Sequence, residues 1–159
     1  MQQFAPIESV SVLFVCKKQI FTVQRQSNLN NFPGYDAFPG GKIDKLESLT
    51  PFKTPFLSDH EPKRMRALIR EIHEELDYDI EKGIKNGDIF SFYEFAKVLA
   101  PEFSIVRFKT WFYRVDLEKK IDFRIDPGEF SKGFWRTPYE IQSNYEGGNS
   151  LMVPPTRWV

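Results

Sequence analysis

The chain has 159 residues, 41% of them hydrophobic, and its 22 basic residues equal its 22 acidic residues in number. This length is sufficient for one globular domain with a substantial core. The charge balance excludes a general attraction to nucleic acid or to an anionic membrane, and no apolar run approaches the ~18 residues of a membrane span.

The cysteine content and the first residues indicate a cytoplasmic location. Cys16 is the only cysteine, so an internal disulfide is excluded, and its apolar neighbours favour a buried structural thiol over a nucleophile. Residues 1–4 lack the basic and apolar regions of a signal peptide. We therefore expect a cytoplasmic protein.

The first part of the chain predicts strands and turns. Ser9–Cys16 and Ile20–Val23 are rich in β-branched residues and flank a short polar stretch, which predicts a hairpin. Arg25–Gly34 is rich in turn residues, and a short strand at Ala37–Phe38 leads into Pro39-Gly40-Gly41. Paired glycines let the backbone approach a ligand closely, so a carbonyl here would suit a metal ion, although an ordinary loop is the simpler interpretation.

A loop and a long helix follow. Leu46–Asp59 has no helical or strand period, but its large apolar side chains need cover, so we expect an ordered loop that forms a pocket wall or part of a dimer contact. The helix is predicted to run from about Ser58–Pro62 to Leu76, with Ser58 and Glu61 at the spacing of a capping box. Its core stripe consists of Met65, Leu68, Ile69, Ile72 and Leu76.

The second half of this helix carries three glutamates on one edge. At 100° per residue, Glu71, Glu74 and Glu75 fall within about 100° of arc. Crowded carboxylates repel each other, and a hard divalent cation such as Mg²⁺ or Mn²⁺ removes that repulsion. A solvated acidic face is the common alternative. A zinc protease motif is excluded, because the position of the second histidine in H-E-x-x-H is Asp77.

The remaining residues predict aromatic strands and a short helix. Ile89–Leu99 and Phe103–Val115 alternate apolar and polar residues, which predicts an antiparallel pair. Asp126–Glu129 is predicted as a turn, Phe134–Trp135 as a short strand, and Thr137–Glu140 as the start of a helix. Beyond it we expect a loop at Asn144–Gly148 and the first turn of a last helix at Pro154–Thr156.

The glycine turn and the glutamate helix together resemble the signature of the Nudix hydrolases, G-x5-E-x7-R-E-U-x-E-E-x-G-U, in which U is apolar. Gly41 and Glu47 match its first half, and Arg70-Glu71 with Glu74-Glu75 match its second half. An extra stretch at about 48–60 separates the halves, and Asp77 replaces the last glycine, a position where Asp tolerates a left-handed helix end. Later residues match relatives that have such an insertion: Glu129, Trp135–Pro138, Gly147 and Pro154–Thr156.

This resemblance implies an α+β fold, an α/β/α sandwich with a mixed β-sheet, as one domain over residues 1–159. In relatives the Pro-Pro-Thr segment opens a longer helix, which suggests an amino-terminal domain of a longer protein. The implied reaction is hydrolysis of the diphosphate linkage in a nucleoside diphosphate attached to another group, with Mg²⁺ or Mn²⁺ as cofactor. The implied partner is a nucleotide-type small molecule, with no nucleic acid and no membrane, and a homodimer is also considered.

The resemblance implies roles for individual residues. Glu71, Glu74 and Glu75 would bind the metal, together with the carbonyl of Gly40. Arg70 would orient Glu71 or a neighbouring carboxylate, and Glu129 or Glu71 would be the general base. Arg25 and Lys42 flank the glycine turn and would contact phosphate, with solvated surface charge as the alternative.

The substrate stays open among three classes. Arg25, Gly34 and Phe38 reproduce a spacing found in coenzyme A diphosphatases, but Gln26 and Asn30 depart from that pattern. A coenzyme A-like compound, ADP-ribose and a nucleotide sugar are therefore all candidates. The alternative function is a catalytically silent Nudix-fold module that binds a nucleotide and regulates a partner domain. The intact glutamates favour the enzyme, because a silent module needs no cluster of three carboxylates.

Overall fold

Within the residues that the computed structural model describes, 5–100, 107–148 and 152, seven strands form one mixed sheet. The strand order is β3-β2-β1-β6-β5, with β4 also paired to β1 and β7 also paired to β2. β1 and β6 run parallel, and the other pairs are antiparallel. The strands are β1 (Ile7–Cys16), β2 (Gln19–Arg25), β3 (Asp36–Ala37), β4 (Gly40–Lys42), β5 (Ile89–Leu99), β6 (Phe108–Leu117) and β7 (Phe130–Arg136).

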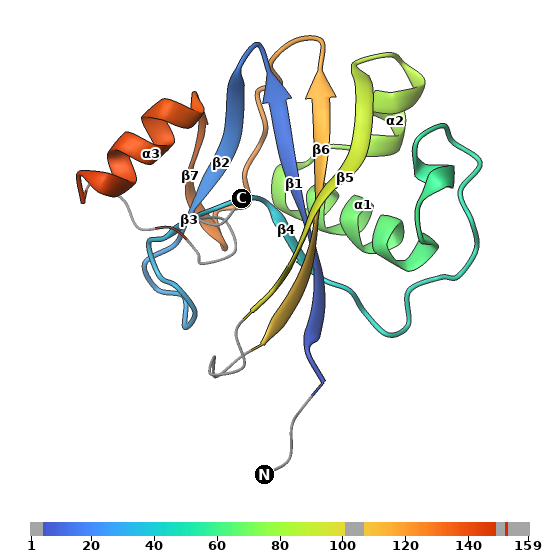
Figure 1. Ribbon diagram of the computed structural model, residues 1–159, viewed down its shortest axis with the longest axis horizontal. Coiled ribbons are helices and arrows are strands. Elements are labelled where there is room, and N and C mark those ends of the chain that lie inside the picture. Colours follow the sequence, from blue (N-terminus) through green and yellow to red (C-terminus); the bar gives the residue numbers. More distant parts are fainter. Residues whose placement is uncertain (1–4, 101–106, 149–151, 153–159) are drawn as a thin grey trace.

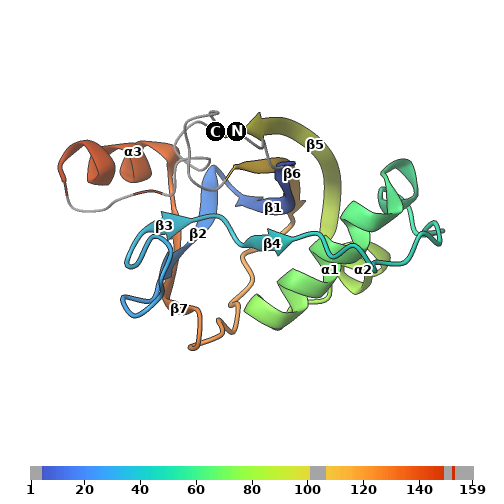
Figure 2. The same ribbon diagram turned by 90° about the horizontal axis from the view of Figure 1, so that it is seen from below.

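Helices lie on two sides of these strands (Figure 1, Figure 2). α1 (Pro62–Leu76) and α2 (Ile80–Lys85) lie together on one side, and α3 (Pro138–Glu146) lies on the other. A 3-10 turn, η1 (Leu57–Asp59), precedes α1. The predicted mixed sheet between helices is confirmed. In the described part of the chain, no helix combines the length and the apolar character of a membrane span.

α1 packs its apolar stripe against the sheet. The stripe residues Met65, Leu68, Ile72 and Leu76 are at most 1% exposed and share one core with Val10, Val12 and Phe14 of β1. Ile69, which was also predicted in the stripe, is only partly buried at the margin of this core. Burial of one such side chain stabilises the fold by about 1.5–3 kcal/mol. The packing therefore fixes the direction in which the glutamate edge of α1 points.

The two ends of α1 have different caps. The carboxylate of Glu61 accepts hydrogen bonds from the backbone N–H groups of Lys63 and Arg64, each at 3.1 Å. The predicted capping box at Ser58 is therefore wrong, because Ser58 belongs to η1 and Glu61 itself is the cap. At the other end Asp77 adopts the left-handed conformation with φ 52°, as expected for a residue in the place of a glycine.

Several contacts anchor the loop that precedes α1. Phe52 and Leu57 are buried, and the guanidinium of Arg66 lies 3.8 Å over the Phe52 ring. Arg66 also donates to the carbonyl of Thr50, and the Thr54 hydroxyl donates to Glu81 of α2 at 2.9 Å. The loop is ordered, as predicted, while its place as an insertion within the family signature stays a prediction.

Three elements differ from the sequence-based expectation. β7 is longer than Phe134–Trp135, because it pairs along nearly all of β2. α3 continues to Glu146, through part of the stretch predicted as a loop. α2 was not predicted, since six residues are too few to show a helical period. The first hairpin and the β5–β6 pair are confirmed, whereas residues 103–106 and Pro154–Thr156 lie outside the described residues.

Candidate active site

A glycine turn is built into the sheet beside the middle of β1. β1 and β2 pair only next to their own turn, so β4 can pair with the residues Ser9–Ser11 of β1. Gly40 has φ +155°, and a Cβ at this position would overlap the carbonyl oxygen of Val10. A Cβ on Gly41 would overlap the carboxyl group of Glu71. The two glycines therefore bring the backbone into contact with β1 and with the glutamate edge of α1.

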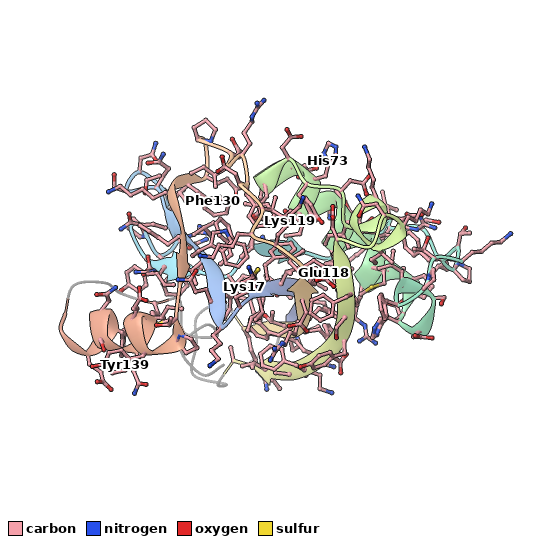
Figure 3. The ribbon with its side chains drawn as sticks, turned by 90° about the horizontal axis from the view of Figure 1, so that it is seen from above. Lys17, His73, Glu118, Lys119, Phe130 and Tyr139 are labelled. Carbon is pink, nitrogen blue, oxygen red and sulfur yellow. The ribbon has the colours of Figure 1, made fainter. Side chains whose placement is uncertain are left out.

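The three glutamates of α1 occupy different environments. Glu75 is 3% exposed. The side chain of Glu71 is 17% exposed, and that of Glu74 is 60% exposed. Glu71 and Glu75 thus lie on the inner part of the edge, and Glu74 lies on its outer part. His73, from the incomplete zinc motif, is exposed at the surface (Figure 3).

Arg70 connects the two halves of the signature. Its Nε and one Nη donate to Glu47 Oε1 at 3.0 and 2.7 Å, and its other Nη donates to Glu71 Oε1 at 2.8 Å. A further bond at 3.1 Å reaches the carbonyl of Lys42 in β4. Charge-assisted bonds in this fork geometry fix direction as well as distance. The geometry suits the expected orienting role of Arg70, and Glu47 meets it although 22 residues separate Glu47 from Arg70 in sequence.

Glu75 is a buried carboxyl group without a hydrogen-bond partner among the described residues. Burial raises the pKa of Glu75 well above its ordinary value, and the charges of Glu129 and Glu71 raise it further. The backbone of Gly40 acts in the opposite direction, and a side-chain contact with Glu71 raises the pKa of Glu75 further, although neither contact has the geometry of a hydrogen bond. Burial also raises the pKa of Glu71, against the opposing effect of Arg70. Buried polar groups are normally paired, so Glu75 lacks a partner that a cation would supply.

Glu129 reaches this edge on a turn that is held from two sides. The backbone N–H of Asp126 donates to the carbonyl of Glu75 at 2.8 Å. Just after β2, the Gln26 N–H donates to the carbonyl of Glu129 at 2.8 Å, and the Gln26 side chain donates to the carbonyls of Pro127 and Phe130 at 2.9 and 3.1 Å. Glu129 is exposed, and its charge acts on Glu75. The role of Gln26 was missed, because one glutamine carries no sequence pattern that points to a turn 101 residues away.

The two predicted phosphate contacts lie at the sides of this region. Arg25 ends β2, and its Nε donates to the carbonyl of Asn31 at 3.0 Å, which helps to close the turn-rich segment. Lys42 is the last residue of β4. Its carbonyl accepts a hydrogen bond from Arg70, and its side chain is exposed. Their contact with phosphate stays a prediction.

The chemistry of the donors suits a hard divalent ion. Carboxylate oxygens of Glu71 and Glu75, with a backbone carbonyl at Gly40, are ligands that Mg²⁺ and Mn²⁺ prefer. The unpartnered Glu75 fits such an ion. Over the described ranges, however, no three acidic, histidine or cysteine side chains converge on one point. Glu74 faces solvent, so it or water molecules would complete the ligand set, as is common for Mg²⁺.

Known proteins share both the sequence pattern and the fold. Residues 6–159 match the family model for the NUDIX domain. No protein with a curated description matches the chain by sequence. Among solved structures, the chain is similar to a NUDIX hydrolase from Alicyclobacillus acidocaldarius, with a TM-score of 0.77 and 16% identity over 98% of this chain and 89% of that chain.

Two further solved structures are similar. One is the NUDIX domain of Shewanella oneidensis NrtR complexed with ADP ribose, with a TM-score of 0.61 and 14% identity over 89% of this chain and 79% of that chain. The other is a bifunctional NMN adenylyltransferase/ADP ribose pyrophosphatase from Francisella tularensis, with a TM-score of 0.63 and 16% identity over 99% of this chain and 40% of that chain. At such identities these similarities establish the fold. The family model covers nearly the whole chain, and the chain therefore belongs to the Nudix hydrolase family.

Proposed function

We propose that this Nudix hydrolase cleaves the diphosphate linkage of a nucleoside diphosphate attached to a second group, with Mg²⁺ or Mn²⁺ as cofactor. The supporting observation is Glu75, which is buried near Glu71 and Glu129 and has no hydrogen-bond partner in the described parts of the chain. A carboxylate in that position gains a partner when a divalent ion binds, and the ion in turn attracts the diphosphate. A purely structural glutamate would be expected to have a protein partner.

Each residue has a separate task in this proposal. Glu71, Glu74 and Glu75 would hold the ion with the Gly40 carbonyl, and the bound ion would neutralise diphosphate charge and acidify water. Arg70 keeps Glu71 oriented, so that its carboxylate needs little rearrangement when the ligand arrives. Arg25 and Lys42 would add phosphate contacts on the two sides of the glycine turn.

Glu129 is the residue that we favour as general base. A base must lie close to the attacking water and must not be fully occupied by other tasks. Glu71 is already bonded to Arg70 and is proposed as a metal ligand. Glu129 is exposed, acts electrostatically on Glu75, and is carried by a turn that Gln26 holds in place.

ADP-ribose is the first substrate to test, with nucleotide sugars and coenzyme A-like compounds next. One of the similar structures, at 14% identity, is a complex with ADP ribose. Another, at 16% identity, has ADP ribose pyrophosphatase in its name. The coenzyme A-like spacing has less support, because Gln26 uses its side chain to hold the turn of Glu129 at a position where those enzymes have a small residue.

One observation favours the second candidate, a catalytically silent module that binds a nucleotide. The side chain of Glu74 is 60% exposed, and within the part of the chain that the structure describes no three potential metal ligands converge. A module that only binds a nucleotide would not need a complete metal site. The two functions differ in whether any diphosphate substrate is consumed.

A substrate panel tests the proposal. ADP-ribose, nucleotide sugars, coenzyme A, NADH and dinucleoside polyphosphates are each incubated with Mg²⁺, with Mn²⁺ and with chelator, and products are separated by chromatography. We expect metal-dependent cleavage of at least one compound, and its loss in Glu74→Gln without loss of the fold. Wild-type activity in Glu74→Gln would contradict the assigned ligands. Absence of turnover together with thermal stabilisation by a nucleotide would favour the binding module.

Three other features, two of the whole protein and one of the loop before α1, stay predictions from the sequence. They are a cytoplasmic location, a homodimer and a pocket wall formed by this ordered loop. Light scattering during size-exclusion chromatography tests the homodimer directly.

A further inference from the structure

The sheet ends on one side at β5, which pairs only with β6 in the described part of the chain. Figure 1 and Figure 2 show it as the outer strand on its side of the sheet. Proteins protect such an edge with short strands, proline, charges or bulges. β5 has 11 residues and no proline, but it has two bulges and two charged residues, Glu94 and Lys97. The arrangement of these bulges and charges decides what the edge can bind.

Large apolar side chains are exposed along β5. Among the described residues nine such side chains are exposed, and four of them belong to β5: Phe90 at 54%, Tyr93 at 43%, Phe95 at 37% and Leu99 at 46%. Each other strand or helix in this part of the chain has one at most. β7, which pairs only with β2, exposes Ser131, Lys132 and Gly133 instead. The apolar surface is therefore concentrated at one edge of the sheet.

Backbone groups at the outer side of β5 have no strand to pair with. The N–H of Ala100 donates to the carbonyl of Phe108 in the neighbouring strand at 2.8 Å. Because hydrogen-bonded and non-bonded pairs alternate in an antiparallel ladder, the N–H and carbonyl groups of Lys97 and Leu99 point away from β6. Over the described ranges, no other segment forms a backbone hydrogen bond with them. These groups would pair with a further strand.

A bulge near the centre of β5 places two neighbouring residues on one face. The register with β6 shifts between Glu94 and Ala96, so Phe95 is the extra residue. Ala96 lies opposite Phe112, and the Phe95 ring contacts the Phe112 ring with centroids 6.3 Å apart. Phe95 and Ala96 therefore both lie on the face of the sheet that carries Phe112.

The charged residues on the two sides of this bulge share the other face. Glu94 lies opposite Tyr113 and Lys97 lies opposite Trp111, and both of these rings belong to the core under α1. One oxygen of Glu94 bonds to Arg64 at 2.9 Å. Lys97 forms no ion pair with any residue that the structure describes. Lys97 can therefore accept a partner from outside, and Glu94 has a second oxygen to offer.

The faces of these residues select one register for antiparallel pairing of β5 with a second copy of itself. Opposite residues in such a pair lie on the same face, and a two-fold axis makes the pairing reciprocal. An axis at Phe95 would place Glu94 opposite Ala96, and an axis at Ala96 would place Phe95 opposite Lys97, so both mix the faces. An axis between Phe95 and Ala96 keeps the faces together. It pairs Phe92 with Leu99, Tyr93 with Val98, Glu94 with Lys97, and Phe95 with Ala96.

The pairs in this register are complementary in charge and size. Glu94 of each copy meets Lys97 of the other, and Tyr93 meets a β-branched side chain, both of which are favourable cross-strand pairs. The Phe95 ring lies opposite the small Ala96, so two large rings do not compete for space at the axis. An unrelated neutral strand would leave the charges of β5 unpaired. The charges thus favour a second copy over other strands.

We propose that β5 pairs with β5 of a second copy about a two-fold axis between Phe95 and Ala96. The product is a homodimer in which one sheet continues through both copies. The exposed rings of β5 gain neighbours across the axis, and the outward backbone groups gain hydrogen bonds. This inference goes beyond the proposed hydrolysis and is independent of it, because none of these residues belongs to the proposed catalytic set.

The test is size-exclusion chromatography with light scattering, together with sedimentation velocity, on the whole chain over a range of concentrations. We expect a reversible dimer for wild type. Lys97→Glu should raise its dissociation constant about tenfold or more, because two ion pairs become two like-charge pairs. Hydrogen exchange reports the strand pairing itself. The Leu99 amide should be protected in the wild-type dimer and should exchange rapidly in Lys97→Glu.

A pair of variants tests the register. Glu94→Lys should also weaken the dimer, and circular dichroism with thermal unfolding shows whether its fold survives the loss of the Arg64 contact. An equimolar mixture of Glu94→Lys and Lys97→Glu should form a heterodimer, because each charge then meets its opposite. Failure of the mixture to associate, with both variants folded, would overturn the register.

A charge change at the other edge is the matched control. Lys132→Glu on β7 makes the same change of charge at an exposed strand position and should leave the dimer unchanged. A wild-type chain that stays monomeric at every concentration would overturn the proposal and leave the edge to a different strand. A dimer that Lys97→Glu leaves intact, or that Lys132→Glu weakens equally, would also overturn it.

Discussion

The two halves of α1 carry charged clusters that differ in how fully their groups are paired. In the first half, Arg64 is 2.9 Å from Glu94, 3.7 Å from Glu61 and 3.2 Å from the Tyr113 hydroxyl. In the second half, Arg70 forms ion pairs with Glu47 and Glu71, while Glu75 is buried without a hydrogen-bond partner among the described residues. The first cluster is complete within the protein, and the second is not. The incomplete one is therefore where a ligand is expected, because a fold selected for stability alone would pair or remove Glu75.

Among the proposed variants, Glu75→Gln should cause the largest loss of activity. The amide keeps the shape of the side chain but cannot neutralise a divalent ion, so turnover should fall by about 10²- to 10³-fold. The melting temperature in chelator should not fall, because the buried ionisable group is replaced by a neutral one. The measurement is initial rate with the best substrate of the panel, together with thermal unfolding. A variant that is unstable but active would show that Glu75 serves the fold.

Arg70→Ala should have the next largest effect. Arg70 does not touch the proposed ion, but it orients Glu71 and links it to Glu47 and to the Lys42 carbonyl. Loss of an outer-shell partner typically lowers metal affinity or activity by about 10- to 100-fold. We expect a raised Mg²⁺ requirement for half-maximal rate. Arg70→Lys should rescue little, because one ammonium group cannot reproduce the fork of three contacts.

Gln26→Ala should have a smaller effect, through the position of Glu129. Removal of the side chain deletes the two bonds to Pro127 and Phe130, so the turn gains freedom. We expect kcat to fall by about tenfold, less than the ~10²- to 10⁴-fold contribution of a general base, because Glu129 is loosened and not removed, while the Mg²⁺ requirement stays as in wild type. Gln24→Ala, two residues earlier at the end of β2, is the matched control, since Gln24 bonds to Gly34 and Ser131 instead. Equal rates in the two variants would show that Gln26 does not contribute to catalysis through the turn of Glu129.

Some of these features could be predicted from the sequence alone, and others could not. The stripe of α1 and its glutamate edge follow from helical spacing, and the hairpin and the β5–β6 pair follow from alternation. The partners of these residues do not follow from spacing. Glu61 as the cap, Gln26 on the Glu129 turn and the solvent-facing Glu74 depend on how distant segments meet. β7 was predicted too short, because Ser131, Lys132 and Gly133 lack the apolar alternation of a buried strand.

His60 lies next to the complete cluster and offers the smallest test. Its ring contacts Phe92 and Tyr113, with centroids 5.5 and 5.3 Å away. Burial lowers the pKa of His60 below its ordinary value of 6.5; the charges of Asp59 and Glu94 oppose this, and Arg64 adds to it. The unfolded chain therefore binds this proton more readily than the folded protein does. Stability supplied by neutral His60 is present above pH 6.5 and is lost as the pH falls through the lowered pKa.

His60→Phe should remove this component, because the ring stays against Phe92 and Tyr113 but cannot take a proton. Urea unfolding of both proteins between about pH 7 and about pH 5 measures it, and the free energy of unfolding of wild type should fall more steeply with acid. Glu94→Gln sharpens the comparison, because loss of the Glu94 charge lowers the pKa of His60 further and should steepen that fall. Parallel curves for wild type and His60→Phe would mean that the complete cluster leaves His60 as free to take a proton as it is in the unfolded chain. The paired half of α1 would then contribute no pH dependence through this residue.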